Sequence, residues 1–221
     1  MILYVTSRDM QNFYQTVKKM KYSSREDIAI PIESHLPIPC SLSPIIVEMA
    51  DNKRIISSLA IWRKSALHFI PSTKPITIRG TREWLWNKVI YEPDRLLFLV
   101  MAEGKPIGHI GLYRYNAIKR SIVVDNVIRG VTGYPGLMGE AILTLIRWAK
   151  QTLSIKTFLV DCSSDNAKAI ALYTRIGFKE INREPLIRVK TPGGYVFQDA
   201  PKHHTGPIKY FRVLFSMPIH T

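Results

Sequence analysis

Apolar residues recur at helical spacing near the start of the chain. Met10, Phe13, Tyr14, Val17 and Met20 follow the i, i+3, i+4, i+7 pattern that places side chains on one face of a helix. This pattern predicts a helix that ends near Tyr22. The apolar run at residues 2–6 predicts a short strand before it, and Thr6 and Asp9 have the spacing of a capping box at the helix start.

Four prolines interrupt residues 28–44 and favour an extended connector, because proline lacks the amide hydrogen that helices and central strands need. We therefore place a boundary near residue 43. Residues 1–43 form an N-terminal extension, and residues 44–221 form one α/β domain. The helix at 8–22 fits a docking or dimerisation arm, which leaves a homodimer open, but plain packing on the domain fits it better.

Strand and helix signals alternate from residue 44 onward. The predicted strands cover 45–49, 96–102, 107–115, 121–128 and 158–162, then a strand that starts at 178 and a last one at 210–218. Two helices follow the N-cap candidates Asp51 and Thr81, and two more cover 137–153 and 166–176. The order β-α-α-β-β-β-α-β-α-β-β predicts a mixed sheet with helices on both faces. Residues 191–209 are predicted to be a long loop of the kind that often forms a lid.

The composition is that of a globular protein. The chain has 221 residues, of which 46% are hydrophobic and 22% charged. We expect a cytoplasmic protein with no membrane partner, because no apolar run reaches about 18 residues and no signal peptide is evident. Cys40 and Cys162 fit no zinc pattern and are expected to be reduced thiols. The pair His203–His204 lacks carboxylate neighbours in the sequence, so we expect no metal.

The net charge is unusually positive. Thirty-one Lys and Arg against seventeen Asp and Glu give +14, and nearly all of the excess follows residue 43. A basic surface attracts polyanions, among them nucleic acid, a phosphorylated cofactor or a nucleotide sugar. Charge alone does not choose between these partners, and it is equally compatible with a surface that has no specific anionic partner.

A strand, a glycine-rich loop and a helix follow one another at residues 121–153. The first amides of a helix have no internal partner, and the helix dipole adds partial positive charge there. Amides near Leu137, Met138 and Gly139 are therefore candidates to bind a pyrophosphate. The arrangement is common, and packing alone explains it equally well.

The segment from Asn166 to Phe178 reads Asn-x-x-Ala-x-x-Leu-Tyr-x-x-x-Gly-Phe. It resembles the last conserved helix of the GNAT superfamily of acyl-CoA N-acetyltransferases. The stretch that begins Ala60-Ile-Trp-Arg-Lys is similar to the family's first helix, and Ile107-Gly-His-Ile-Gly-Leu to its third strand. The resemblance covers residues 44–182, and more loosely the strand at 210–218.

The resemblance implies a three-layer α/β/α fold with a mixed, mostly antiparallel, twisted sheet that is splayed at its centre. It also implies acetyl-CoA as co-substrate, in a gap between strands 121–128 and 158–162. The backbone of Val127 and Ile128 would bond the pantetheine arm and stabilise the oxyanion, and Asn166 would bond the CoA arm. The residues implied at the pyrophosphate are Arg129, Gly136, Leu137, Met138 and Gly139.

Two departures affect the phosphate loop. Residues 131–135 look like an insertion, and Met138 stands where the family has a small residue. The bulk of Met138 would widen the path of the loop. The anion site itself rests on backbone amides and is expected to survive.

Tyr173 occupies the family's general-acid position and would protonate the departing thiolate. The alternative is a tyrosine that packs beside Leu172 with its hydroxyl in solvent. Asp125 is our first candidate for the general base, His109 the second and Glu83 the third. An exposed or ion-paired Asp125 is an equally good interpretation, and His109 fits a core or substrate-positioning role better than that of a base.

The resemblance implies direct attack of a primary amine on the thioester in a ternary complex. The loop at 65–80, with Trp84 and Trp86, and the last hairpin would set the acceptor. The charge favours a small amine on an anionic carrier, such as a nucleotide-linked amino sugar. The alternatives are an acetyltransferase for a protein N-terminus, or a basic non-catalytic module that binds RNA, the ribosome or an acyl-CoA. Nucleic acid is the weaker candidate, because no RNA-reading aromatic motif is present.

Overall fold

The computed structural model describes residues 2–23, 28–69, 74–192 and 194–219. Within them a nine-stranded sheet has the order β1-β2-β3-β4-β5-β6-β9-β7-β8. Its strands are β1 (Ile30–Pro31), β2 (Cys40–Pro44), β3 (Leu96–Ala102), β4 (Lys105–Asn116), β5 (Ser121–Arg129), β6 (Thr157–Ser163), β7 (Lys179–Thr191), β8 (Gly194–Asp199) and β9 (Tyr210–Pro218). Among the strands in the described residues, only β5 and β6 pair in parallel, so the sheet is mixed and mostly antiparallel.

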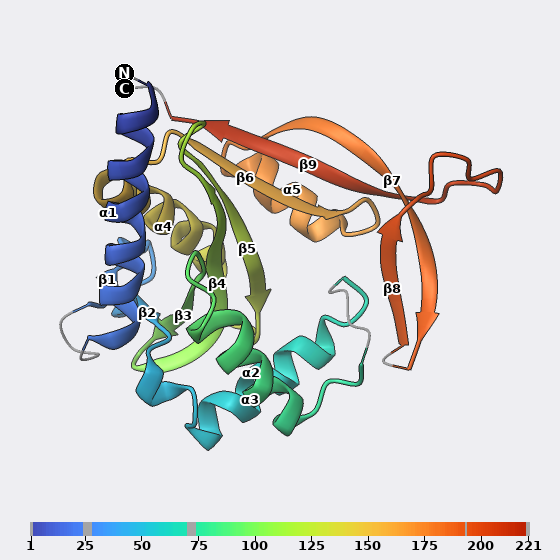
Figure 1. Cartoon of the computed structure of the whole chain (residues 1–221). Helices are drawn as coiled ribbons and strands as arrows, with labels where there is room; N and C mark the ends of the chain where they lie inside the picture. Colours follow the sequence, from blue (N-terminus) through green and yellow to red (C-terminus); the bar gives the residue numbers. More distant parts are fainter. Residues whose placement is uncertain (1, 24–27, 70–73, 193, 220–221) are drawn as a thin grey trace.

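Helices cover both faces of this sheet (Figure 1). The α-helices are α1 (Ile2–Tyr22), α2 (Lys53–Ser65), α3 (Ile78–Leu85), α4 (Leu137–Leu153) and α5 (Ala167–Arg175). A 3-10 turn at Val47–Met49 precedes α2, and a π-helical turn at Trp86–Ile90 follows α3. The sequence prediction of a mixed sheet between two helical layers is confirmed.

The strand β3 shows why two layers are needed. All seven of its residues are buried. Leu96, Phe98 and Val100 pack with α1 and α4, whereas Leu97 and Leu99 pack with α2 and α3. A strand that is apolar on both faces is stable only when each face is covered.

The helix α1 packs along α4 and β3 (Figure 1). The ring of Phe13 stacks on Tyr115 at 4.1 Å, and Arg120 donates to the carboxylate of Asp9 at 2.6 Å. The side chain of Lys21 is 2% exposed and donates to the carbonyl of Ile90 at 3.2 Å. The end of α1 is therefore fixed to the core.

Several predictions for the first half of the chain were wrong. Residues 2–6 are the first turns of α1 and not a strand, because a short apolar run also fits a helix that continues beyond it. The first long strand is Cys40–Pro44 and not 45–49; its edge pairs with β3, so prolines at its ends do not interrupt it. The boundary near residue 43 stays a prediction about domain organisation, and it falls within this strand.

The predicted caps were also displaced. Asn52, and not Asp51, caps α2 by accepting from Arg54 and Ile55 amides. Thr77, and not Thr81, caps α3 by accepting from the Gly80 amide. Asp51 instead accepts from Arg82 at 2.7 Å and from Trp86 at 3.0 Å.

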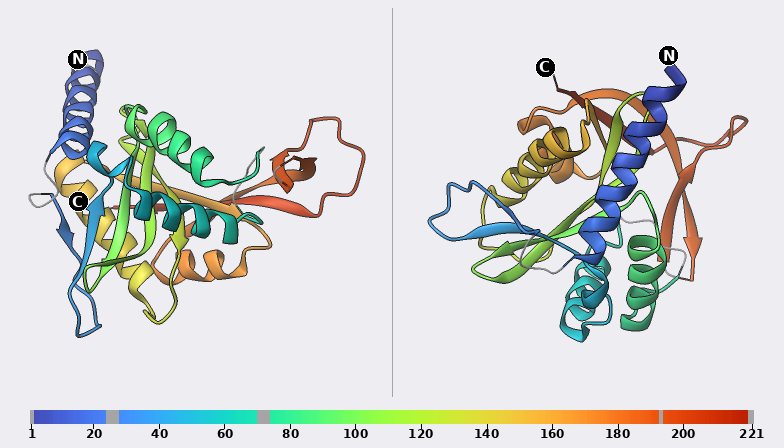
Figure 2. Two further views of the ribbon diagram at one scale, coloured as in Figure 1. Left: turned by 90° about the horizontal axis from the view of Figure 1, so that it is seen from below. Right: turned by 60° about the vertical axis from the view of Figure 1, so that its left-hand side comes forward.

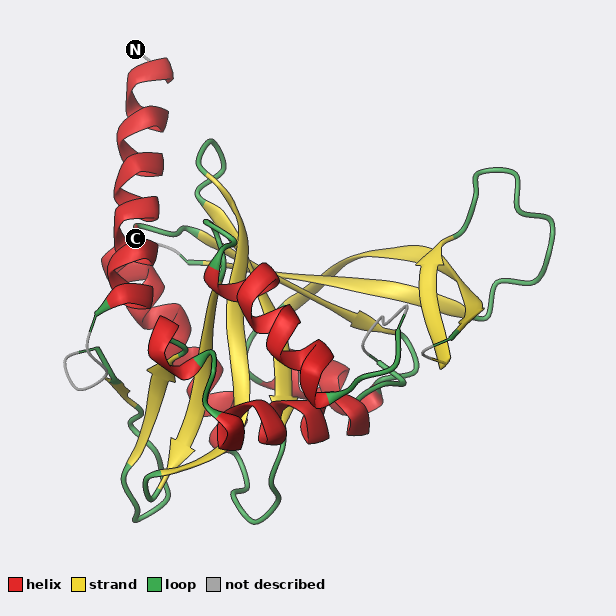
Figure 3. Ribbon diagram, turned by 60° about the horizontal axis from the view of Figure 1, so that its bottom comes forward, coloured by secondary structure: helices red, strands yellow, loops and turns green. Residues whose placement is uncertain are grey.

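The predicted loop at 191–209 contains the strand β8, which pairs with β7 as a hairpin. The strands β7, β8 and β9, here called the arm, continue the sheet beyond β6, and the hairpin of β7 and β8 projects toward the end of α2 (Figure 2). Figure 3 shows the same arm beside the red helices α2 and α3. This arm places a second wall next to the centre of the sheet.

Candidate active site

A cavity of about 1060 Å³ lies where the sheet divides. The parallel pairing of β5 with β6 ends at Val123 and Leu159. Beyond that point, among the described residues, the edge of β5 that faced β6 has no strand partner. Residues of β5, β6, α5, the loop before α4, the end of α2 and the arm line the cavity.

A bulge in β5 directs the strand away from β6. The pairing of β4 with β5 shifts register between His109 and Gly111, and Asn126 has a left-handed φ of 50°. Such bulges bend a strand and expose part of its edge. Val127 and Ile128 follow the bulge directly and line the cavity, as do Arg129, Gly136 and Gly139.

The loop before α4 ends at Gly136, whose φ of 78° requires glycine or a strained residue. Leu137 is fully buried and does not line the cavity. Met138 borders the cavity but is only 7% exposed, and its sulfur is directed at Gly108. The side chain of Met138 therefore packs into the core beneath the loop, and the effect of its bulk on the path of the loop stays a prediction.

Residues before β2 contact the first turn of α4. The carboxylate of Glu140 accepts a hydrogen bond from Ser34 at 2.7 Å and pairs with the His35 ring. That ring also covers Gly136, where an added Cβ would lie 2.8 Å from it. No local sequence pattern indicates this contact, because about a hundred residues separate its partners.

Asn166 begins α5 as its N-cap, and its side-chain oxygen accepts from the Ala169 amide at 3.1 Å. Tyr173 lies nearly two turns later, lines the cavity and is 4% exposed. Its ring meets Phe178 and Phe215 edge-on. Burial raises the pKa of Tyr173 above its ordinary value, so the phenol keeps its proton at neutral pH. The alternative of a solvent-exposed hydroxyl does not match this burial.

Asp125 lines the cavity and is ion-paired. Arg95 lies 2.9 Å from its carboxylate and stacks on Tyr113 at 3.7 Å, while Asn126 donates to the same oxygen at 2.9 Å. The other oxygen is buried and has no hydrogen-bond partner among the described residues. Burial raises the pKa of Asp125 to about 6, although Arg95 and Asn126 oppose that shift.

The other two base candidates lie outside the cavity lining. The His109 ring is fully buried, 6.2 Å from the Trp62 ring, and neither ring nitrogen has a partner among the described residues. Burial lowers the pKa of His109 to about 3, so the ring is neutral. Glu83 pairs with Arg79 on the exposed side of α3.

Sequence reasoning missed two groups on β6. Asp161 lines the cavity, and burial raises the pKa of its carboxyl although Arg212 and Arg114 oppose the shift. Cys162, a free thiol like Cys40, also lines the cavity. Burial raises the pKa of Cys162 to about 12, so it stays protonated. Both residues follow a short apolar run in the sequence, and exposed strand residues often have the same position. The sequence therefore did not mark them as site residues.

The described residues contain no group of three or more His, Cys, Asp or Glu that is placed to hold a metal ion. Among the same residues, no helix has both the length and the apolar character needed to cross a membrane.

A family model for the acetyltransferase (GNAT) domain matches residues 47–179, which is more than half of the chain. The protein belongs to the GNAT acetyltransferase family. The match spans α2 to the start of β7, and so includes the divided strands, the loop before α4 and the helix of Tyr173. No curated protein matched the sequence significantly.

Solved structures share the GNAT fold. RimL, a ribosomal L7/L12 alpha-N-protein acetyltransferase in complex with coenzyme A, is 14% identical over 87% of this chain and 98% of its own, with a TM-score of 0.66. A ribosomal-protein-S5-alanine acetyltransferase from Vibrio fischeri is 14% identical over 87% and 97%, with a TM-score of 0.63. MccE, the microcin C7 self-immunity acetyltransferase in complex with acetyl-CoA and AMP, is 15% identical over 81% and 92%, with a TM-score of 0.59.

Proposed function

We propose that this GNAT protein transfers an acetyl group from acetyl-CoA to a primary amine by direct attack in a ternary complex. The observation that carries the proposal is the cavity between the divided strands, with a buried, protonated tyrosine on its wall. Acetyl-CoA is supported by the family match and by similar structures that contain CoA or acetyl-CoA.

The first amides of α4, after Gly136, suit the pyrophosphate, because helix N-termini bind anions. Arg129 lies at the same end of the cavity wall and adds positive charge. The unpaired edge of β5 at Val127 and Ile128 suits the amide groups of the pantetheine arm. Asn166 already uses its side-chain oxygen for capping, which leaves its amide donors for the arm.

The acceptor nitrogen attacks the thioester carbonyl carbon, and amides of β5 stabilise the oxyanion. The carbon–sulfur bond then breaks, and Tyr173 gives its proton to the thiolate. Cys162 is not proposed as an acyl carrier, since only the thiolate is a good nucleophile and this thiol is protonated. Direct transfer therefore fits the cavity better than a covalent intermediate.

The ammonium of the acceptor must lose a proton before or during attack. Asp125 stays our first candidate for this base. Asp161 is a second one, because its carboxyl lies on the opposite strand of the same gap. His109 remains a positioning candidate, since its neutral ring supports the wall of β4 without touching the cavity.

The acceptor we favour is a small amine on an anionic carrier, such as a nucleotide-linked amino sugar. A protein N-terminus is the alternative, since RimL and the S5-alanine enzyme act on ribosomal proteins by name. A basic module without catalytic activity is the third hypothesis for the function. The cytoplasmic location and a homodimer stay predictions.

The test is release of free CoA from acetyl-CoA, followed with a thiol reagent. The acceptor panel contains amino-sugar nucleotides, polyamines, aminoglycosides and short peptides. We expect turnover with one class, and a loss of about 100- to 10,000-fold in kcat for Tyr173→Phe, which removes only the donor. Acetyl-CoA binding without release for any acceptor would favour the non-catalytic module, and no binding of acetyl-CoA would overturn the proposal.

A further inference from the structure

A small recess of about 180 Å³ lies beside the main cavity, between the end of α2 and the arm. Six residues line it: Leu67, His68, Arg188, Gly194, Tyr195 and Phe197. Phe197 also lines the main cavity, so one side chain separates the two spaces. A molecule in the main cavity can therefore extend past Phe197 into the recess.

The hairpin register gives the recess its chemistry. Arg188 pairs with Phe197, and Lys190 pairs with Tyr195. Because side chains alternate along a strand, these four residues share one face of the hairpin. Leu186, two residues before Arg188, lies on the same face and lines the main cavity. The face thus changes from apolar at the cavity to basic and aromatic at the hairpin tip.

Arg188 differs from the other arginines of the arm. Arg183 pairs with Glu180 at 2.7 Å, and Arg212 pairs with Glu184 and Asp199 at 2.8 Å. Arg188 has no ion pair with any described carboxylate. Its guanidinium lies 3.9 Å over the Tyr195 ring, a contact that fixes its plane and leaves its N–H edge open.

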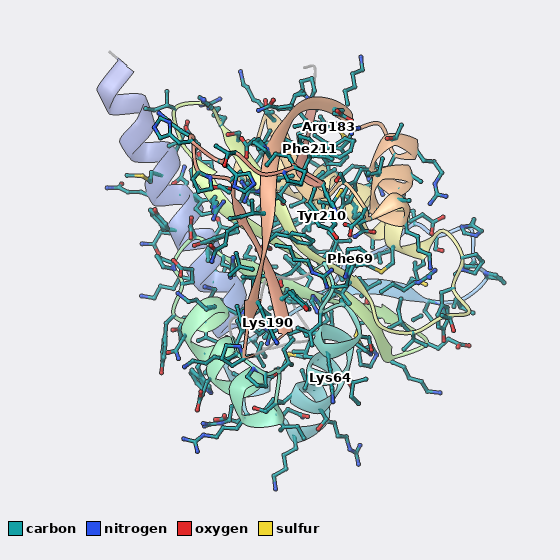
Figure 4. All side chains as sticks on the ribbon, turned by 90° about the vertical axis from the view of Figure 1, so that its right-hand side faces the viewer. Lys64, Phe69, Arg183, Lys190, Tyr210 and Phe211 are labelled. Atoms are coloured by element: carbon teal, nitrogen blue, oxygen red, sulfur yellow. The ribbon has the colours of Figure 1, made fainter. Side chains whose placement is uncertain are left out.

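Side-chain contacts also hold the wall of the recess that lies opposite the hairpin. His68 is held by Asp165 at 2.7 Å, and its ring meets Phe69 and Phe197 edge-on. The end of α2 therefore lies against the hairpin with defined side-chain positions. Figure 4 shows Lys64 and Phe69 of this wall on the same side of the molecule as Lys190 and Tyr210 of the arm. Among the residues that line the recess, Arg188 is the one that carries a fixed positive charge.

We propose that the recess binds an anionic group of the acceptor, a phosphate or a carboxylate, while the acceptor amine reaches the main cavity past Phe197. The proposal rests on the proposed acetyltransferase function and names its substrate class. A planar guanidinium with a free edge binds either anion through two parallel hydrogen bonds. Tyr195 and Phe197 exclude water from one side, which strengthens such bonds.

The experiment compares acceptors that differ only in the anionic group. Glucosamine and glucosamine 1-phosphate form one pair, and an amino acid and its amide form the second. For the favoured anionic acceptor, Arg188→Ala is expected to lower kcat/KM about 10- to 100-fold, mainly through KM, and to change the neutral partner less than about twofold. Arg188→Lys is expected to recover only part of the loss, because a point charge does not reproduce the paired bonds.

Lys119→Ala is the matched control, because it removes one exposed positive charge from the turn between β4 and β5 and should change neither acceptor. The KM for acetyl-CoA should be unchanged in all three variants. Equal use of the charged and neutral acceptors, or equal losses for both in Arg188→Ala, would overturn the recess. A preference for the charged member of the first pair would identify the bound anion as a phosphate, and the same preference within the second pair would identify it as a carboxylate.

Binding separates this inference from the proposed function. Calorimetry with glucosamine 1-phosphate and with the free amino acid needs no turnover. Binding that Arg188→Ala weakens tenfold or more would support the recess even if no acetyl group is transferred, and would then count against the proposed activity alone. Binding of neither probe, or binding equal in Arg188→Ala and the native protein, would reject the recess while turnover elsewhere leaves the acetyltransferase intact.

Discussion

At the residue scale, Asp125 combines a position in the cavity with a pKa raised to about 6 by burial. A base works only when deprotonated, so kcat/KM should fall about tenfold per unit as the pH drops below about 6. Asp125→Asn should remove this acidic limb and lower kcat/KM at neutral pH about 100-fold or more. The measurement is a pH profile of kcat/KM from pH 5 to 9.

The acceptor amine also titrates, so the profile needs two acceptors with different amine pKa values. A limb that belongs to the enzyme stays at the same pH, whereas a limb of the acceptor moves. Asp161→Asn is the matched variant on the opposite strand. A limb that persists in Asp125→Asn and disappears in Asp161→Asn would reassign the base.

The burial of His109 predicts an effect of pH on the stability of the fold, in contrast to the effect of Asp125 on catalysis. Burial lowers the pKa of His109 in the folded protein to about 3, below the usual value near 6.5. Between these two pH values the unfolded chain binds a proton at His109 and the folded chain does not. Stability is therefore lost as pH falls below about 6.5, by up to about 1.4 kcal/mol per unit. His109→Leu should lose less than the native protein between pH 7 and 5 in urea denaturation, and equal slopes would contradict the lowered pKa.

At the scale of elements, sequence periodicity worked where one pattern dominated. The bounds of β3, α4 and β9 matched the prediction, because each has a continuous apolar or amphipathic pattern with clear turn residues at its ends. The caps of α2 and α3 were misplaced because Asp, Asn and Thr occur close together there. β8 was missed because its apolar run, Tyr195–Phe197, is only three residues long and lies between glycines and polar residues, as in a loop.

The crossing of α2 over the end of β5 depends on a glycine. A Cβ on Gly130 would lie 2.1 Å from the Trp62 indole, and Trp62 lines the cavity. Gly130→Ala should therefore displace the indole and destabilise the fold by about 1–3 kcal/mol. In a double-mutant cycle, Trp62→Leu should cost less in the Gly130→Ala background than alone, because the smaller side chain relieves the clash. Additive free energies of unfolding would show that the two residues do not compete for this space.

At the scale of the whole molecule, the sequence indicated the family and most of the cavity wall but not its long-range partners. Asp125, Asn166 and Tyr173 were named from strand position and motif, and all three line the cavity. The Arg95 partner of Asp125 and the pairing of His35 with Glu140 were not foreseen. Both depend on how distant strands and loops meet, which a local pattern does not encode. The position of the arm beside α2 likewise depends on contacts between segments that are far apart in the sequence.

The N-terminal helix supplies a last prediction about the whole fold. Phe13 is 2% exposed and belongs to the same buried cluster as α4 and the central strands. Phe13→Ala should thus cost about 3–5 kcal/mol in urea denaturation, whereas the exposed Gln15→Ala should cost less than about 0.5 kcal/mol. No described residue of α1 lines the cavity, so kcat/KM of the folded variant should stay within about twofold of the native value. If α1 were a separate docking arm, Phe13→Ala would leave the main unfolding transition unchanged; a single shifted transition would instead show that the helix and the catalytic domain unfold as one cooperative unit.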